Sequence, residues 1–368
     1  MPLDHSFSRR EFLVSTSCLG AALAFARYLP LPALAESILQ DPRVAEMPVL
    51  DKGFAATRKI GEGVYATISD FSQGLQTLCN GGFLVGRDAA LIIEGHHAPA
   101  GAAFELEALR LLSQVPVRAA VDTHYHYDHT MGNAFYGGQG IPVWAHPLAG
   151  PLMIERYASL QGKDKAPLLA PYQKRLSDAA TEAERLRAQS DLGAFQLIFG
   201  TIDSTVIALP NQPLDVSKLP LQVDLGGLTA VIETYPGHTP TDIVIRVPDQ
   251  NIIFTGDLLF NGWYPATFDG EMSPWLATLG KFAAFGKDAL FVPGHGQVCS
   301  QEGVASERAV FEHLREHARK CHQAGLPVEE AQRRYTVPES FASFVVFSWE
   351  LCIYAAIAKF YEEFAQRR

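Results

Sequence analysis

The sequence predicts an α/β protein in which two β-sheets pack face to face and helices cover their outer faces. Short apolar runs of strand length recur in both halves of the 368-residue chain. Several of these runs end at histidine or aspartate residues beside glycine, at positions where the functional side chains of sheet proteins collect. We therefore expect a four-layer αββα sandwich with a helical insertion and C-terminal helices, in which strand ends from both halves meet along one edge.

The first half of the chain is expected to supply one sheet and one covering helix. The helix is predicted at residues 98–114, because Phe104, Leu109 and Leu112 repeat at helical spacing. Residues 36–58 contain proline and are expected to form an irregular arm. The predicted strands of this half are 64–68, 75–79, 82–85, 89–94, 117–122 and 142–146.

The second half begins with an expected insertion at residues 148–217. Its part from 172 to 197 is charged and rich in alanine, which favours helix. The insertion would lie over the site-bearing edge, and a lid and a dimer contact are both compatible with the sequence. The strands predicted after it are 221–223, 228–234, 243–247 and 252–255.

Residues 59–300 are expected to form one catalytic domain, followed by a helical extension at 301–368. We expect one helix at 302–324 and a final helical pair at 337–368. The pair carries an apolar stripe that includes Phe341 and Phe344, a feature that indicates core packing or an oligomer contact. A homo-oligomer is therefore compatible with the sequence.

The segment from Thr123 to His129 has the pattern H-x-H-x-D-H. Its histidines and aspartate are side chains that Zn²⁺ prefers in catalytic sites. Residues that alternate along an extended stretch point the same way, so His124 and His126 can reach one metal. Asp128 and His129 follow them, where the chain can bend towards a second metal.

Four residues cannot complete two metal sites, so further ligands must come from elsewhere in the chain. Three candidates follow apolar runs and lie beside or near glycine, in the segments Y-P-G-H-T-P, I-I-F-T-G-D and L-F-V-P-G-H-G. These candidates are His238, Asp257 and His295.

In this order, the seven residues resemble the ligand set of the metallo-β-lactamase superfamily of binuclear metallohydrolases, over roughly residues 60–300. The resemblance implies that one metal is held by His124, His126 and His238. It implies that the other metal is held by Asp128, His129 and His295, with Asp257 as the bridge. An aspartate at the bridge, in place of cysteine, is similar to the glyoxalase II-like branches.

The resemblance implies a hydrolase in which a hydroxide held between two zinc ions attacks an ester, lactone, thioester or amide-type bond of a small molecule. Iron or manganese in place of zinc is compatible with this ligand set. Asp128 is the expected catalytic residue, because it can orient the nucleophile or pass a proton to the leaving group. Two alternatives are an iron-dependent sulfur or persulfide oxidoreductase on the same fold and a non-catalytic periplasmic accessory protein.

Neighbouring residues are expected to support this site. Glu94 takes the place of the aspartate that is usual in the family's first motif, and it is expected behind the ligands. Asp122 or Thr123 can fix an imidazole tautomer. Residues predicted by position to wall the substrate pocket are Trp263, Tyr264 and Phe268.

Three other groups of residues have simpler expectations. His96 and His97 are predicted in a loop near the mouth of the site, where they are either exposed to solvent or in contact with substrate, and Tyr125 and Tyr127 are expected to point away from the first metal. Residues 313–317 read H-x-x-E-H, a pattern that can hold one zinc on a helix. Because a third acidic ligand is not evident, we expect a solvated helix there.

The net charge and the N-terminal sequence indicate which partners and which cellular compartment to expect. The net charge is −10 without a basic block, which argues against a nucleic-acid partner. Residues 8–13 read S-R-R-E-F-L, and an apolar stretch at 14–34 and an A-L-A site at 33–35 follow. This order predicts a twin-arginine signal peptide at 1–35 and a periplasmic or otherwise exported protein.

No segment after the signal is apolar enough to span a bilayer, so stable membrane insertion is not expected after signal removal. An oxidising compartment permits disulfides, but the sequence does not give their pairing. The cysteines that follow the signal lack metal-site spacing and are expected to be mostly buried: Cys79, Cys299, Cys321 and Cys352.

Overall fold

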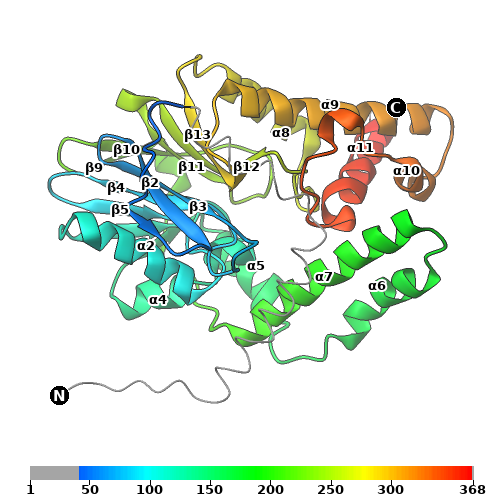
Figure 1. Ribbon diagram of the computed structural model, residues 1–368, viewed down its shortest axis with the longest axis horizontal. Coiled ribbons are helices and arrows are strands. Elements are labelled where there is room, and N and C mark those ends of the chain that lie inside the picture. Colours follow the sequence, from blue (N-terminus) through cyan, green and yellow to red (C-terminus); the bar gives the residue numbers. More distant parts are fainter. Residues whose placement is uncertain (1–40, 367–368) are drawn as a thin grey trace.

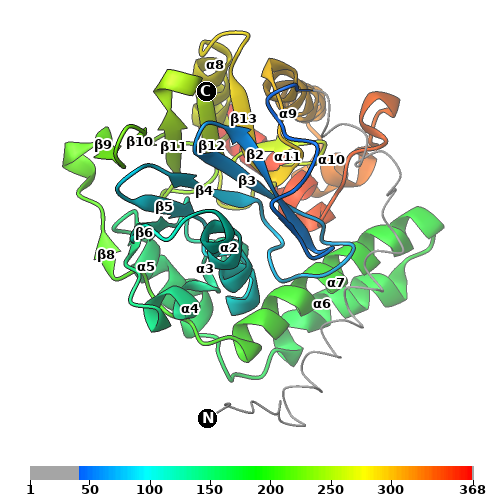
Figure 2. The same cartoon turned by 60° about the vertical axis from the view of Figure 1, so that its left-hand side comes forward.

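The structure is a computed structural model that describes residues 41–366. Two sheets pack face to face and helices lie outside them, which confirms the predicted αββα architecture (Figures 1 and 2). The larger sheet has the strand order β1-β2-β3-β4-β5-β6-β7-β8. Its strands are β1 (Leu50–Asp51), β2 (Ala55–Gly61), β3 (Val64–Ser69), β4 (Gly81–Val85), β5 (Ala90–Ile93), β6 (Val117–Val121), β7 (Val143–Ala145) and β8 (Gln212–Pro213).

The smaller sheet has the strand order β13-β12-β11-β10-β9. Its strands pair antiparallel except for β12 and β13, which are parallel. The parallel pair brings two buried strands side by side, and each carries a predicted ligand in its C-terminal half. The strands are β9 (Leu221–Asp224), β10 (Thr229–Thr234), β11 (Ile243–Val247), β12 (Ile252–Asn261) and β13 (Leu290–Gly296).

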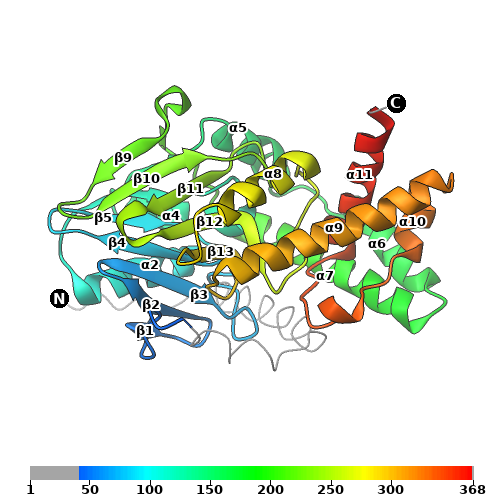
Figure 3. The same cartoon turned by 90° about the horizontal axis from the view of Figure 1, so that it is seen from above.

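Helices cover both sheets. Helix α2 crosses between the parallel strands β5 and β6, as such a connection requires, whereas α8 and α9 pack against β12 (Figure 3). The α-helices are α2 (Pro99–Leu112), α3 (Tyr127–Thr130), α4 (Asn133–Gly138), α5 (Ala149–Met153), α6 (Ala166–Asp178), α7 (Glu182–Ser204), α8 (Met272–Ala283), α9 (Gln301–Gln323), α10 (Val328–Arg334) and α11 (Ala355–Gln366). Two π-helical segments, η1 (Ile154–Ala158) and η5 (Trp349–Tyr354), and three short 3₁₀ turns, η2 (Val216–Lys218), η3 (Pro248–Gln250) and η4 (Glu339–Phe341), complete the helical elements.

The core between the sheets is built mainly from aliphatic side chains of valine, isoleucine, leucine and alanine. Ile93 and Val121 of the larger sheet belong to the same buried cluster as Ile245 and Phe254 of the smaller sheet. Burying such side chains stabilises the fold by roughly 1.5–3 kcal/mol each. The packing fixes the two sheets relative to one another, and therefore fixes the strand ends that carry the site.

Three predicted elements are wrong, and each has a local cause. Residues 75–79 form turns instead of a strand, and Leu78 has φ of +57°. The described part of the predicted arm 36–58 contains β1 and the start of β2, where small residues weaken the strand pattern. The predicted pair at 337–368 is one helical run, because residues 337–348 form only the short turn η4 before η5 continues into α11. The predicted signal peptide lies outside the described residues.

Residues 148–217 contain α5, η1, α6 and α7, and they pack against the C-terminal segment (Figure 1). Asp191 in α7 accepts a hydrogen bond of 2.7 Å from the Ser348 hydroxyl. The Arg187 guanidinium lies 4.0 Å from the centre of the Trp349 ring. These contacts join the insertion to the C-terminal extension.

None of the described helices is both long enough and apolar enough to span a membrane.

Candidate metal centre

The seven predicted ligands come from both sheets and converge on one site. His124 and His126 follow β6, while Asp128 and His129 lie in the one-turn helix α3. From the smaller sheet come His238 after β10, Asp257 in β12 and His295 in β13. The structure therefore joins residues that are far apart in the chain.

Asp257 lies inside its strand instead of at the end where the sequence placed it. The preceding residue, Gly256, has φ of +52°, and the pairing of β12 with β13 shifts register around it. Positive φ is the conformation that glycine adopts at little cost. Irregularities of this kind turn side chains towards active sites, and here the strand continues beyond the carboxylate to Asn261.

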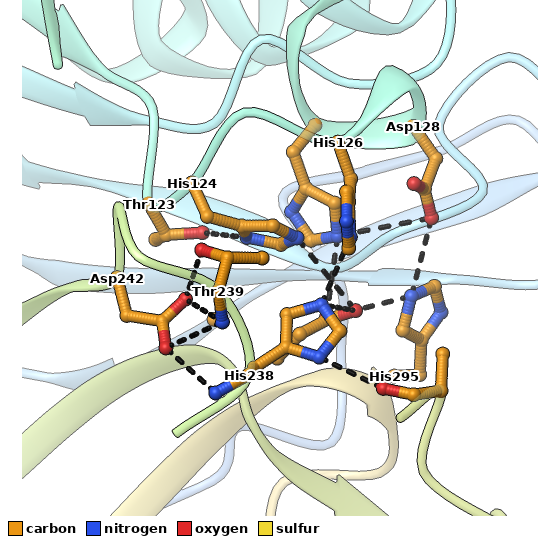
Figure 4. A network of polar contacts seen from close by, with 12 residues as sticks. Thr123, His124, His126, Asp128, His238, Thr239, Asp242 and His295 are labelled. Carbon is orange, nitrogen blue, oxygen red and sulfur yellow. Dashed lines mark hydrogen bonds and ion pairs between the residues drawn. The ribbon is translucent and has the colours of Figure 1, made fainter. Parts of the chain in front are cut away.

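The side chains form two groups in which the potential ligand atoms lie within 4.8 Å of one another. One group consists of His124, His126, His238 and Asp257, and the other consists of Asp128, His129 and His295. All seven residues are buried, and Figure 4 shows imidazoles of both groups pointing towards one another. These groups match the partition implied by the family resemblance, while ligation itself stays a prediction.

Asp257 faces both groups through different oxygen atoms. Its Oδ2 lies 3.4 Å from His238 Nε2 and 3.9 Å from His124 Nε2. Its Oδ1 lies 3.2 Å from His129 Nε2 and 3.5 Å from His295 Nε2. One carboxylate is therefore placed to offer one oxygen to each of two cations, as the bridging position requires.

Hydrogen bonds on the far side of the rings orient two imidazoles. The distance from Thr123 Oγ1 to His124 Nδ1 is 3.1 Å, and the distance from the Ala266 carbonyl oxygen to His238 Nδ1 is 3.0 Å. Both contacts leave Nε2 directed at Asp257. Partners of this kind fix the tautomer of metal-binding histidines. Thr123 thus occupies the supporting position predicted for it, whereas Asp122 pairs with Asn133 instead.

Glu94 lies behind the ligands, as predicted. Its Oε1 is 3.1 Å from His129 Nδ1 and 2.5 Å from Thr123 Oγ1. The residue has φ of +83°, an uncommon backbone conformation for glutamate. The longer side chain in place of aspartate is accommodated, because its carboxylate still holds His129 with Nε2 towards the centre.

Asp242 fixes the turn that carries His238 and was missed by the sequence analysis. Its carboxylate accepts a hydrogen bond of 2.8 Å from the His238 backbone N–H and further bonds from Thr239 (Figure 4). Aspartate commonly closes turns through such bonds to nearby backbone N–H groups. An aspartate four positions after the histidine was the available signal.

His126 offers the opposite nitrogen to the centre. Its Nδ1 lies 2.9 Å from His238 Nε2, while its Nε2 lies 3.1 Å from Asp269 Oδ2. Asp269 also accepts a hydrogen bond from the Tyr125 hydroxyl. The sequence analysis missed Asp269, whose only signal was its place beside Phe268 in the predicted pocket wall. Asp269 is the carboxylate that sets the orientation of His126.

Asp269→Ala is expected to weaken metal binding about 10- to 100-fold, because His126 loses the partner that holds its Nε2. Competition between the purified protein and a chromophoric chelator measures this affinity. Asp249→Ala removes the same charge from an exposed position in η3 and should leave the affinity unchanged. Equal affinity in the two variants would show that Asp269 does not position the ligand.

Buried polar atoms without hydrogen-bond partners point into the site. They include His124 Nε2, His129 Nε2 and Asp257 Oδ1. Each unpaired buried polar atom costs about 1–3 kcal/mol, so their convergence indicates that another group satisfies them. Imidazole nitrogen and carboxylate oxygen are the ligands of catalytic zinc sites. The residues present therefore fit a pair of metal cations.

The protonation states of the two groups differ. Burial lowers the pKa of His124 and lowers the pKa of His238 to about 3, so both rings are neutral at pH 7 and offer a lone pair. Burial also acts against protonation of His295, but Asp257 and Asp128 raise its pKa to about 10. A cation bound at this second group would therefore replace a proton.

The close approach of β13 to Asp257 depends on Gly294. A Cβ at this position would lie 1.9 Å from Asp257 Oδ1. Gly294→Ala is therefore expected to displace the carboxylate and to reduce the metal content of purified protein from about two ions per chain to less than about one. Elemental analysis measures this content.

Gly280→Ala is the matched control, because a Cβ at this helical position meets nothing within 4 Å. It should keep the metal content and be neutral or up to about 1 kcal/mol more stable. A full complement of metal in the Gly294 variant would mean that the carboxylate tolerates displacement.

The prediction of an exposed loop at His96 and His97 is wrong, because both residues are buried. His96 Nε2 lies 3.3 Å from the Glu105 carboxylate in α2, and His97 Nε2 lies 2.6 Å from the Thr201 hydroxyl in α7. Neither lines the cavity at the metal centre. They attach this loop to two covering helices.

The H-x-x-E-H segment packs against the C-terminal part of the chain. His317 Nε2 lies 2.8 Å from the Ala331 carbonyl oxygen, and the His313 ring lies 5.6 Å from the Tyr335 ring. Neither histidine belongs to a group of three potential ligands in the part of the chain that the structure describes.

The four described cysteines are free thiols, and three of them are buried.

A cavity of about 310 Å³ opens onto the metal centre. Members of both groups reach it, including His126, Asp128 and His295. The predicted aromatic wall is confirmed, because the lining includes Trp263, Tyr264 and Phe268. Tyr125 and Tyr127 line the same cavity. A small molecule in this space would therefore contact both groups.

Two packed sheets with a buried histidine and aspartate centre define a class of α/β proteins built to bind metal at their strand ends. A comparison with known protein families supports this class. A sequence profile described as the Metallo-beta-lactamase superfamily matches residues 76–295. The chain belongs to this superfamily.

Individual relatives are distant. A linear primary-alkylsulfatase from Pseudomonas sp. is 23% identical over 254 residues, which cover 66% of this chain and 47% of that protein. A hydroxyacylglutathione hydrolase from Hyphomonas neptunium is 30% identical over 118 residues, covering 32% and 44% of the two chains. The chain thus spans about half the length of the curated relatives it matches.

A solved structure shares the fold over nearly the whole chain. The stereoselective inverting sec-alkylsulfatase from Pseudomonas sp. superposes with a TM-score of 0.56 at 15% identity. The match covers 95% of this chain and 62% of that chain. The likeness therefore extends beyond the two sheets to the insertion and the C-terminal segment.

Proposed function

We propose that this protein is a zinc-dependent hydrolase that cleaves an ester-type bond of a small organic molecule. The position of Asp257 supports the proposal most directly, because its two oxygens face the two groups from the wall of a cavity. Seven candidate ligands in two groups favour a pair of cations over the single iron of a sulfur or persulfide oxidoreductase.

When bound, two zinc ions would supply a water molecule of lowered pKa and would polarise the oxygen of the scissile group. The protein holds the donor atoms in place and limits the access of bulk water through its aromatic wall. Asp128 Oδ2 lies 3.2 Å from His295 Nε2 and borders the cavity. It is placed to take a proton from the attacking water and to return it to the leaving oxygen.

The net reaction adds water across one bond. The hydroxyl of water joins the acyl or sulfuryl centre, the bond from this centre to the leaving atom breaks, and the leaving oxygen, sulfur or nitrogen receives the proton. Relatives named for alkyl sulfate hydrolysis make a sulfate ester one bond to test beside carboxylic ester, lactone, thioester and amide-type bonds.

The experiment is a screen of purified, zinc-loaded protein with 4-nitrophenyl esters, octyl sulfate, lactones, acyl thioesters and nitrocefin. Hydrolysis of at least one class, lost when Asp128 is replaced by asparagine, would support the proposal. No turnover of any class by protein shown to carry two metals would contradict it and would favour the accessory role.

We also propose that the protein is exported, on the strength of the S-R-R-E-F-L pattern at residues 8–13. Replacing Arg9 and Arg10 together by lysine should retain the protein in the cytoplasm. Cell fractionation and immunoblotting measure the distribution. Unchanged export of the double variant would argue against the twin-arginine route.

A further inference from the structure

We propose that the cavity binds an anionic amphiphile, a molecule with an apolar chain and a carboxylate or sulfate group, and that Arg156 is the counter-charge for that group. The inference rests on the proposed function, because it assigns a substrate class to the same site. Three features support it: an apolar wall, the origin of that wall in two joined segments, and one charged side chain beside the metal centre.

The wall beyond the metal centre is apolar and aromatic. Residues 148–217 contribute Tyr157, Leu160, Phe195, Ile198 and Phe199 to it. The C-terminal extension contributes Phe347, Leu351 and Cys352. A small polar substrate would leave this surface in contact with water, whereas an alkyl chain would bury it. The wall therefore selects for a chain of several methylenes.

The two segments that supply this wall are joined by polar contacts outside the cavity. The Ser190 hydroxyl donates a hydrogen bond of 3.0 Å to the Phe347 carbonyl oxygen. Asp191 accepts bonds from the Ser348 hydroxyl and from the Glu350 backbone N–H. These bonds hold both parts of the wall in one arrangement before a ligand arrives, which lowers the entropy lost on binding. The insertion is thus a wall of the site.

Arg156 is the only charged residue among the described lining residues outside the two metal groups. Its Nη2 lies 3.7 Å from Asp269 Oδ1, and its Nε lies 3.6 Å from Glu155 Oε1. Both contacts are ion pairs at distances longer than those of hydrogen bonds, so the half-exposed guanidinium keeps N–H donors for a ligand. A guanidinium presents parallel N–H groups that match carboxylate and sulfate oxygens.

The position of Arg156 relative to Asp269 places this charge next to the metal centre. Asp269 holds His126, so a ligand anion at Arg156 would lie close to the first metal group. The charged end of the amphiphile would then face the centre, and its chain would extend along Phe199 and Phe347. For a sulfate ester, this orientation would present the scissile bond at the charged end to the attacking water, whereas a carboxylate would occupy the same place as a product analogue.

The test is isothermal titration calorimetry of zinc-loaded protein with octanoate, butyrate, octanamide and octanesulfonate, which carries a sulfate-like head group without a hydrolysable ester bond. Octanoate should bind tighter than butyrate by about fourfold per methylene, or roughly 200-fold at full burial. It should also bind at least about tenfold tighter than octanamide, which has the same chain without the charge. The tighter of octanoate and octanesulfonate identifies the preferred head group. Less than about a tenfold difference between octanoate and butyrate would overturn the proposal.

Variants separate the two parts of the ligand. Phe199→Ala should weaken octanoate binding and leave butyrate binding nearly unchanged. Arg156→Gln should reduce the preference for octanoate over octanamide about tenfold, whereas Arg308→Gln, which removes the same charge from α9, should not. Equal charge preference in wild-type protein and in the Arg156 variant would refute the role of this residue.

Failure of this inference can be told apart from failure of the proposed function. The titrations need no turnover, and metal is counted on the same samples. Binding that is selective for chain length and charge, without hydrolysis in the screen, would contradict the hydrolase function and support the amphiphile site. Hydrolysis of short neutral esters, without selective binding of the long anionic ligand, would support the hydrolase function and contradict the amphiphile site.

Discussion

Asp257→Ala is expected to leave the purified protein with less than about one metal ion per chain and to lower its hydrolytic rate at least about 1,000-fold. The reason is geometric, because this carboxylate is the only one whose two oxygens face both described groups. Bound metal contributes several kcal/mol to transition-state stabilisation, and about 4 kcal/mol corresponds to that factor. Elemental analysis and the rate with the best substrate of the screen measure the two effects.

Asp191→Ala is the control for removing a buried aspartate. Asp191 accepts hydrogen bonds from Ser348 and from Glu350, away from the metal centre. This variant should unfold at a lower temperature and still carry both metals. A full metal complement in the Asp257 variant would show that Asp257 does not bridge the two metals, even if activity were lost.

Removal of metal by a chelator is expected to abolish turnover and to lower Tm by at least about 4 °C, and added Zn²⁺ should restore both. The folded protein presents converging unpaired atoms such as His124 Nε2, whereas the unfolded chain does not hold them together. A ligand that binds only the folded state stabilises it by about 4 kcal/mol at a thousandfold excess over Kd. Calorimetry and activity on the same samples measure the outcome.

His313→Ala tests the competing H-x-x-E-H segment in the same assay. Its ring packs on Tyr335 and does not join a ligand group among the described residues, so metal content should not change. Full turnover by protein with less than about 0.1 metal ion per chain would rule out the metal-dependent mechanism.

Local pattern was sufficient for most strands of the two sheets and for the seven converging residues, but it missed β1, β2 and β8. Strands such as β5 are continuous buried runs, and the H-x-H-x-D-H segment carries its chemistry in closely spaced positions. The pattern failed at 75–79, where the apolar residues Leu75 and Leu78 occupy turns instead of a strand. Glycine-rich surroundings there leave the backbone free to bend, and the packing of the loop decides its path.

Supporting residues were harder to predict, because their roles exist only in three dimensions. Asp269 meets His126 across 143 positions of the chain, and no spacing rule relates the two. His97 is buried because Thr201 in the insertion reaches it. A single sequence indicates which side chains can bind a cation, but the residues that orient them depend on packing between distant segments.

The centre draws its side chains from both sheets, and this bears on when it can be assembled. His124 is translated long before Asp257 and His295, and the second group is not complete until β13 has docked beside β12. A nascent chain would offer only scattered, weak donors, so the loading of cations must await the finished tertiary structure. Once bound, the ions would link ligands from the two sheets and oppose the separation of these sheets.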